Sequence, residues 1–264
     1  MTGTWVLPPI VVLDRVGSTN AELLQRGREG APHGAAIRAQ MQTAGRGRRA
    51  HRWTSPEGGL YLSVLIRPHV ASAQLPGLPV ACALGVVSTL QAAGCSRARL
   101  KWPNDVVVGH AKLAGILTEL SHDGSGPFAV CGVGVNMQDP DEGACLDGAL
   151  RPASFTGSLD EGVAMPSLQE LAGQVRAGIV DEAERWEHGL IGAGEGVAPL
   201  TGIVDAYNAC LAFRGKRVSV HAIDGPAAGF GVLLGVDEWG YALVEDDMGQ
   251  VLRLDASQAS IRPA

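Results

Sequence analysis

A basic, glycine-containing loop is the first part of the sequence with the residue types for chemistry. Between residues 38 and 52 the chain has five arginines and no acidic residue. Gly45 and Gly47 leave backbone amides open to a ligand, and the forked guanidinium groups of Arg46 and Arg48 suit an anion. The pattern predicts a phosphate or carboxylate site, with a solvated basic loop as the alternative. A dinucleotide-binding loop is excluded, because such a loop is followed by a helix and the residues after this one lack a helical pattern.

Two lysines flank a second candidate segment. Lys101, Lys112 and Lys216 are the only lysines among the 21 basic residues, and the first two lie close together in the sequence. A lysine ammonium is a compact charge that fits between two anionic oxygens, which favours an anion-binding role for Lys112. A protective charge at a sheet edge is the alternative. Asn104 and Asp105 between the two lysines offer polar groups for a ligand, or only a turn before a strand.

A predicted strand over residues 128–136 contains two glycines, Gly132 and Gly134. Glycine weakens a strand, so it usually marks a bulge or the close approach of a ligand or another backbone. A kink in the sheet and a ligand contact therefore both remain open. Asn136 either reads the edge of a purine or only ends the strand.

The composition limits the class of protein. The chain has 264 residues, 46% of them hydrophobic and 18% charged, which is typical of one large folded domain or of a large and a small one. The net charge of −6 argues against binding nucleic acid through overall charge. Because the five cysteines are scattered, no zinc motif is present and the N-terminus lacks a basic signal region, we expect a reduced, cytoplasmic protein.

The hydrophobic pattern predicts an α+β fold with a mixed or antiparallel sheet. We expect a helix capped by Ser18 or Thr19, with Glu22 as the returning acid of a capping box. The charge-free stretch 70–96 is broken by proline, glycine and polar residues, so a buried helix over 79–93 is expected rather than a membrane span. The other expected elements are strands over 10–13, 35–42, 60–66, 99–102, 105–108, 112–120 and 128–136, a surface loop over 137–165, and helices over 168–189 and 204–211.

The sequence pattern changes near residue 213, where short predicted strands begin to follow one another at regular spacing. They are expected over 217–222, 229–236, 241–245 and 251–254, separated by turns rich in aspartate and glycine. This spacing predicts a small barrel. We therefore divide the chain into residues 1–212 and residues 213–264.

Taken together, the motifs resemble the biotin–protein ligase family. The matching segments are Ser18-Thr19-Asn20, the loop 42–48, Lys101-Trp102-Pro103-Asn104-Asp105, and residues 112–117 and 132–136, in this order. The resemblance implies a catalytic domain like that of class II aminoacyl-tRNA synthetases, followed by an SH3-like domain. It also implies that biotin reacts with Mg·ATP to give biotinyl-5′-AMP and pyrophosphate. Biotin is then transferred to one lysine of a carboxylase's biotin carboxyl carrier domain.

The resemblance assigns roles residue by residue. Lys112 and Arg48 are expected to stabilise charge during the reaction, and Asp105 to orient or deprotonate the acceptor lysine, with Mg²⁺ binding or a structural role as its alternatives. Mg²⁺ is otherwise expected to be held by ATP phosphates. The biotin-binding set is Ser18, Thr19, Gln42, Gly45, Arg46, Arg48, Lys112, Gly115, Gly132 and Gly134, and the adenylate-binding set is Arg46, Arg48, Trp53, Asn104, Lys112 and Asn136.

The sequence also departs from the family pattern. Ala50 and His51 stand where many members have glycine and arginine, which leaves residue 51 without an assigned role. Few residues precede the first motif, so we expect no DNA-binding domain, no specific nucleic-acid partner and no membrane contact, in a monomer or homodimer. The rival interpretations are a lipoate–protein ligase or octanoyl transferase, a nucleic-acid-binding protein that uses the basic loop, and a biotin sensor without catalysis.

Overall fold

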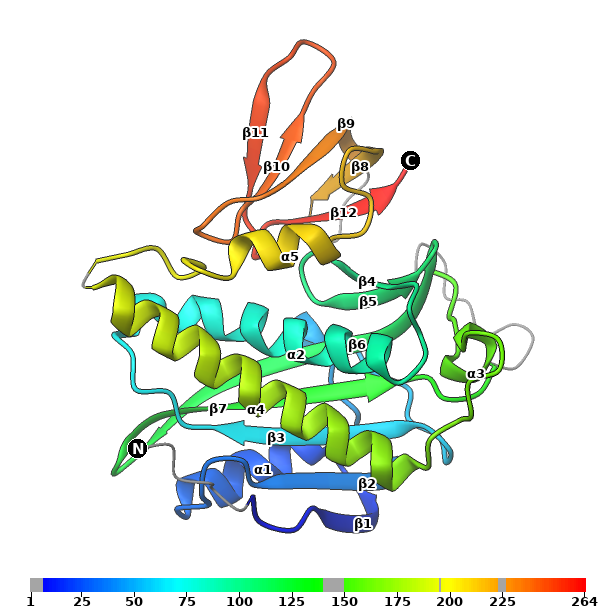
Figure 1. Ribbon diagram of the computed structural model, residues 1–264, viewed down its shortest axis with the longest axis vertical. Helices are drawn as coiled ribbons and strands as arrows, with labels where there is room; N and C mark the ends of the chain where they lie inside the picture. Colours follow the sequence, from blue (N-terminus) through cyan, green and yellow to red (C-terminus); the bar gives the residue numbers. More distant parts are fainter. Residues whose placement is uncertain (1–6, 140–149, 195, 223–226) are drawn as a thin grey trace.

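The computed structural model describes residues 7–139, 150–194, 196–222 and 227–264 of the protein (Figure 1). Its larger sheet runs in the order β1-β2-β3-β7-β6-β5-β4. Only the β1–β2 pair in this sheet of the described chain is parallel, so the predicted mixed sheet is confirmed. The strands are β1 (Val11–Val16), β2 (Ala36–Gln42), β3 (Leu60–Ile66), β4 (Ala98–Lys101), β5 (Asp105–Val108), β6 (Ala111–Asp123) and β7 (Gly126–Val135).

Helices cover both faces of this sheet (Figure 1). The α-helices are α1 (Thr19–Arg28), α2 (Leu78–Ala92), α3 (Phe155–Ser158), α4 (Leu168–Ala193) and α5 (Val204–Cys210), and the 3₁₀ turns are η1 (Arg48–Ala50) and η2 (Ser72–Gly77). The alternation of side chains along β3 separates two cores, since Leu62 and Val64 join the α2–α4 side while Leu65 joins the α1 side. The stretch Ser72–Ala92 has the length and composition of a membrane span, but α2 packs against α4 and is largely buried, as predicted for a core helix.

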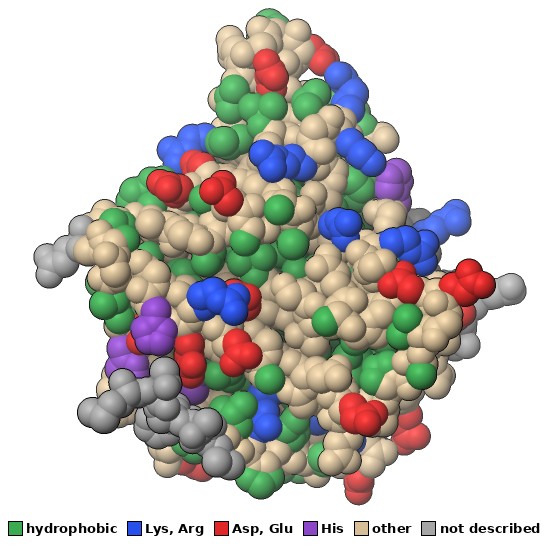
Figure 2. Space-filling model, viewed as in Figure 1, with side chains coloured by type: hydrophobic (Ala, Val, Ile, Leu, Met, Phe, Trp, Pro, Cys, Tyr) green, Lys and Arg blue, Asp and Glu red, His purple; other side chains and the backbone are tan. Residues whose placement is uncertain are grey.

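The smaller sheet is antiparallel and runs in the order β11-β10-β9-β8-β12. Its strands are β8 (Arg217–Ala222), β9 (Ala227–Val236), β10 (Ala242–Glu245), β11 (Val251–Leu254) and β12 (Ala259–Pro263). The last strand, β12, was not predicted, because its short sequence alternates weakly and ends in proline. Figure 2 shows hydrophobic side chains gathered between this sheet and the body of the molecule. A cavity of about 570 Å³ lies there, between α2 and the smaller sheet.

Three predicted details are wrong. Ser18 caps α1, so Glu22 stands one position too far along for a capping box and instead pairs with Arg26 at 2.9 Å. The helix expected to end at residue 189 continues to Ala193, because Leu190 is buried. The expected loop 137–165 contains the short helix α3, although residues 140–149 of that loop lie outside the described residues.

Candidate functional site

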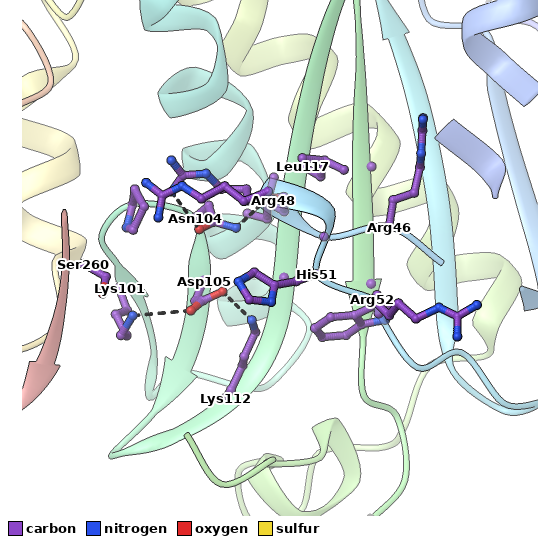
Figure 3. Close-up of a pocket in the computed structure, with 18 of the residues that line it drawn as sticks. Arg46, Arg48, His51, Arg52, Lys101, Asn104, Asp105, Lys112, Leu117 and Ser260 are labelled. Atoms are coloured by element: carbon purple, nitrogen blue, oxygen red, sulfur yellow. Dashed lines mark hydrogen bonds and ion pairs between the residues drawn. The ribbon is translucent and has the colours of Figure 1, made fainter. Parts of the chain in front are cut away.

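The predicted site residues gather around a cavity of about 440 Å³ (Figure 3). The basic loop covers the cavity, β6 and β7 form its floor, and the turn after β4 and strand β12 close one side. Of the predicted residues, the cavity is lined by Ser18, Thr19, Gln42, Arg46, Arg48, Trp53, Asn104, Asp105, Lys112, Gly115, Gly132 and Gly134. Gly45 and Asn136 are not among the lining residues. Asn136 instead donates from Nδ2 to the Lys112 carbonyl at 3.2 Å.

Three glycines make the floor close to flat. Gly115 and Gly134 are paired across β6 and β7, and the Trp53 indole rests on both. A Cβ at position 134 would lie 2.3 Å from Trp53 Nε1, and one at position 132 would lie 2.1 Å from Asn20 Oδ1. In this structure two side chains, rather than a ligand or another backbone, closely approach these glycines. Trp53 Nε1 is buried without a hydrogen-bond partner among the described residues.

Polar side chains at the start of α1 form the end of the cavity beside β2. The Thr19 backbone amide and hydroxyl both donate to Gln42 Oε1, at 2.9 and 3.1 Å. Gln42 Nε2 in turn donates to Ser55 Oγ at 2.9 Å. Asn20, which received no role from the sequence, is buried and donates to the Leu117 carbonyl and to Glu119. These contacts hold a set of donors and acceptors suited to a neutral polar ligand group.

The two arginines expected to act together point in different directions (Figure 3). Arg46 Nη1 lies 3.1 Å from Glu119 Oε1 on β6. Arg48 donates to Asn104 Oδ1 at 3.4 Å and to the Ala256 carbonyl at 2.6 Å, so it connects the turn after β4 to the C-terminal part of the chain. Burial lowers the pKa of the Arg48 guanidinium, with a further contribution from Arg49, but an arginine stays charged in proteins.

One carboxylate between two lysines is the strongest electrostatic feature of the site. Lys112 Nζ lies 2.6 Å from Asp105 Oδ1, and Lys101 Nζ lies 3.4 Å from Asp105 Oδ2. The β4–β5 register places Lys101 directly opposite Asp105. Burial opposes the charged carboxylate, but the two ammonium groups outweigh it and hold the pKa of Asp105 below its ordinary value. Asp105 is therefore an ionised, partly shielded anion inside a largely cationic cavity.

This arrangement does not suit a metal ion held by protein side chains. Both oxygens of Asp105 face ammonium groups, and Glu119 is engaged by Arg46 and Asn20. Within the described ranges, no group of three histidine, cysteine, aspartate or glutamate side chains has the geometry of a metal site. The alternative role of Asp105 as a Mg²⁺ ligand does not fit these contacts.

Several lining residues were missed by the sequence-based assignment. His51 and Arg52 line the cavity from within the basic loop, and Ser260 and Arg262 reach it from β12. No local pattern marks the β12 residues, because pairing with β8 brings them to the cavity. Lys101 also received no role, although the scarcity of lysine in this chain was a signal that could have found it.

Comparison with known proteins identifies the family. Residues 12–136 match the biotin/lipoate A/B protein ligase family model. A biotin–[acetyl-CoA-carboxylase] ligase of Paracoccus denitrificans is 34% identical over 245 residues, covering 90% of this chain and 95% of the relative. A protein of the same name from Mycobacterium tuberculosis is 37% identical over 184 residues, covering 67% of this chain and 65% of the relative.

Solved structures agree with the sequence comparisons. The Aquifex aeolicus biotin protein ligase in complex with biotin and ATP superposes with a TM-score of 0.75 at 25% identity, covering 97% of this chain and 99% of that one. The similarity thus extends over both sheets. By its match to the Paracoccus relative along nearly the whole of both chains, this protein belongs to the biotin–protein ligase family.

Proposed function

We propose that this protein activates biotin with ATP to biotinyl-5′-AMP and then transfers biotin to a lysine of a biotin carboxyl carrier domain. The observation that carries the proposal is the cavity itself. It has neutral donors and acceptors at one end, from Thr19 and Gln42, and cations at the other, from Arg48 and Lys112. Biotin has a neutral ureido ring at one end and a carboxylate at the other, so its polarity matches that of the cavity.

Within this proposal, Lys112 leaves Asp105 to bind the biotin carboxylate and the α-phosphate of ATP. Its charge then stabilises the negative charge that develops as the mixed anhydride forms. Arg48 closes the same end of the cavity. Trp53 moves away from the glycines of β6 and β7 and covers the ligand. Together the two side chains exclude water from the anhydride. Asn104 serves the adenine side, as the family resemblance implies, whereas Asn136 lies outside the cavity lining and holds the Lys112 backbone. The single cluster of Arg48, Asp105 and Lys112 therefore serves both half-reactions.

Several finer features belong to the same proposal. Any Mg²⁺ required would be held by the ATP phosphates, because Asp105 and Glu119 are paired with cations in this structure. The catalytic domain comprises residues 1–212, and the smaller sheet forms an SH3-like domain over residues 213–264. The protein acts in the cytoplasm on a biotin-dependent carboxylase. The family model also covers lipoate ligases, but the relatives at 34% and 37% identity are biotin ligases, which favours biotin.

The deciding experiment is ATP-dependent transfer of labelled biotin to a purified carrier domain. We expect label on the intact domain and none on a domain whose acceptor lysine is replaced by arginine. A parallel reaction with labelled lipoate tests the rival acid. Formation of a lipoyl adenylate without any biotinyl adenylate would overturn the proposal.

A further inference from the structure

Lys101 is a buried lysine that has no role so far in either half-reaction. Its side chain is only 7% exposed, yet it borders the cavity, and its Nζ lies 3.4 Å from Asp105 Oδ2. Figure 3 shows Lys101 and Lys112 on opposite sides of Asp105. Burial of an ammonium group is costly even when the group is paired, so the place of Lys101 beside this carboxylate requires an explanation.

The two lysines differ in the room that their side chains have. Lys101 on β4 lies directly opposite Asp105 on β5, so one strand pair fixes both backbones. The backbone of Lys112 is fixed as well, because its amide donates to the Arg151 carbonyl at 2.7 Å and its carbonyl accepts from the Ala153 amide at 2.8 Å. The Lys112 side chain, however, is 29% exposed and lines the cavity. This exposure leaves Lys112 room to exchange partners, whereas the buried Lys101 stays beside Asp105.

The second lysine changes the charge balance around Asp105. Asp105 and Lys112 alone would form a neutral pair, with Nζ 2.6 Å from Oδ1. If Lys112 left this pair for a ligand anion, it would leave behind an ionised carboxylate whose side chain is only 14% exposed. An unpaired charge in such surroundings is strongly disfavoured, and it would also repel the ligand anion. With Lys101 present, the departure of Lys112 leaves a neutral Lys101–Asp105 pair, and the positive charge of Lys112 is available to the ligand.

The other cations nearby do not replace Lys101 in this balance. Arg48 acts electrostatically on Asp105, and Arg262 acts on Lys101. Within the described part of the chain, however, neither arginine forms an ion pair with Asp105, whose ion pairs are with the two lysines. Arg48 instead donates to the Ala256 carbonyl at 2.6 Å. Lys101 is therefore the fixed counter-ion of this carboxylate.

We propose that Lys101 is a positioning residue that frees Lys112 to bind the carboxylate of biotin. Lys101 acts through Asp105, because it keeps the carboxylate paired when Lys112 leaves it. The inference rests on the proposed ligase function, since biotin is the ligand whose carboxylate Lys112 would bind. It adds to that function a residue whose ammonium group is needed in place, beside Asp105, rather than on the substrate.

The test is calorimetric titration with biotin and with biotinol, in which an uncharged hydroxymethyl group replaces the carboxylate. The variants are Lys101→Met and Lys101→Arg, with Lys216→Met at the exposed third lysine as the matched control. In Lys101→Met we expect the dissociation constant for biotin to rise by about tenfold or more, the scale of a lost charge-assisted contact, because Lys112 stays with Asp105. The dissociation constant for biotinol should not change. Lys101→Arg keeps the charge and should bind biotin more tightly than Lys101→Met does.

A double-mutant cycle tests whether the effect passes through Asp105. Lys101→Met is measured again in an Asp105→Asn background, where no carboxylate holds Lys112. We expect Lys101→Met to leave the biotin affinity of this background unchanged. A direct attraction between Lys101 and biotin would instead weaken binding equally in both backgrounds, and that result would overturn the inference.

Two results with Lys101→Met alone would also overturn the inference. An equal loss of affinity for biotin and biotinol would indicate a structural role for Lys101, and an unchanged biotin affinity would show that Lys112 does not need it. If the methionine variant does not fold, Lys101→Gln gives the same comparison, because its amide can still donate to Asp105 but carries no charge. A wild-type protein that binds no biotin would instead contradict the ligase function itself.

Discussion

Replacing Lys112 by alanine tests the central electrostatic argument. Lys112 Nζ contacts Asp105 Oδ1 at 2.6 Å and lies 5.2 Å from the centre of the Trp53 ring. Lys112 and Arg48 both line the cavity. Lys112→Ala therefore removes a cation from the place where, in the proposed reaction, the biotin carboxylate and the α-phosphate meet.

The size of the effect follows from the burial of the site. Unit charges about 4 Å apart interact by about 4 kcal/mol at the effective dielectric constant of about 20 typical of partly exposed protein sites. Removal of one main electrostatic stabiliser commonly costs about 10²- to 10³-fold in rate, or roughly 3–4 kcal/mol. We therefore expect the rate of biotin-dependent pyrophosphate exchange to fall by at least about 10²-fold.

The controls separate chemistry from folding. Lys216→Ala removes an exposed lysine and should leave exchange unchanged. Lys112→Ala leaves Asp105 paired with Lys101 only, so the far-ultraviolet spectrum and urea midpoint of each variant should be recorded. Wild-type exchange in a folded Lys112→Ala protein would refute the role assigned to Lys112. Biotin binding without exchange in the wild type would instead identify a sensor.

Three further outcomes are expected. Gly134→Ala adds a Cβ 2.3 Å from Trp53 Nε1, so it should displace the indole and weaken biotin binding by tenfold or more, about 1.4 kcal/mol, in calorimetric titration. Gly189→Ala, in open space on α4, should raise the free energy of unfolding in urea by about 0.4–1 kcal/mol without changing activity. The pKa of Lys101 is lower in the folded protein than its ordinary value of 10.5, so between these two values the unfolded chain binds more protons at this residue. In this pH window Lys101 therefore makes the free energy of unfolding rise with pH. Lys101→Met should remove this contribution, which urea titrations at several pH values measure.

Most of the fold could be predicted because its elements are defined by local patterns. The alternation over residues 60–66 gives β3 its two faces, and Pro79 marks the first turn of α2. The errors arose where tertiary contacts determine the end of a helix or the existence of a strand. Burial of Leu190 extends α4 past Gly189, and β12 exists because β8 pairs with it from about 40 residues away.

The sequence motifs of the site could be predicted, but the contacts between their side chains could not. The glycines of β7 and the basic loop were evident in the sequence, since their residue types are unusual for strands and surface loops. The pairing of Arg46 with Glu119 depends on a separation of 73 residues that no local pattern encodes. The β4–β5 register and an irregularity between Val106 and Val107 together decide that Lys101 and Lys112 both reach Asp105.

The choice of lysine at these two positions itself requires an explanation. The chain has 21 basic residues and only three lysines, so arginine is its usual cation. Arginine forms stronger bidentate pairs with carboxylates and would hold Asp105 more firmly than lysine does. Lysine differs in two ways that matter here. Its ammonium is a point charge that can exchange one anionic oxygen for another, as the proposed role of Lys112 requires, and its pKa responds to burial, which lowers the pKa of Lys101. Two lysines around one carboxylate therefore leave Lys112 able to move to a ligand while Lys101 still pairs with Asp105, whereas two arginines would hold the carboxylate in place.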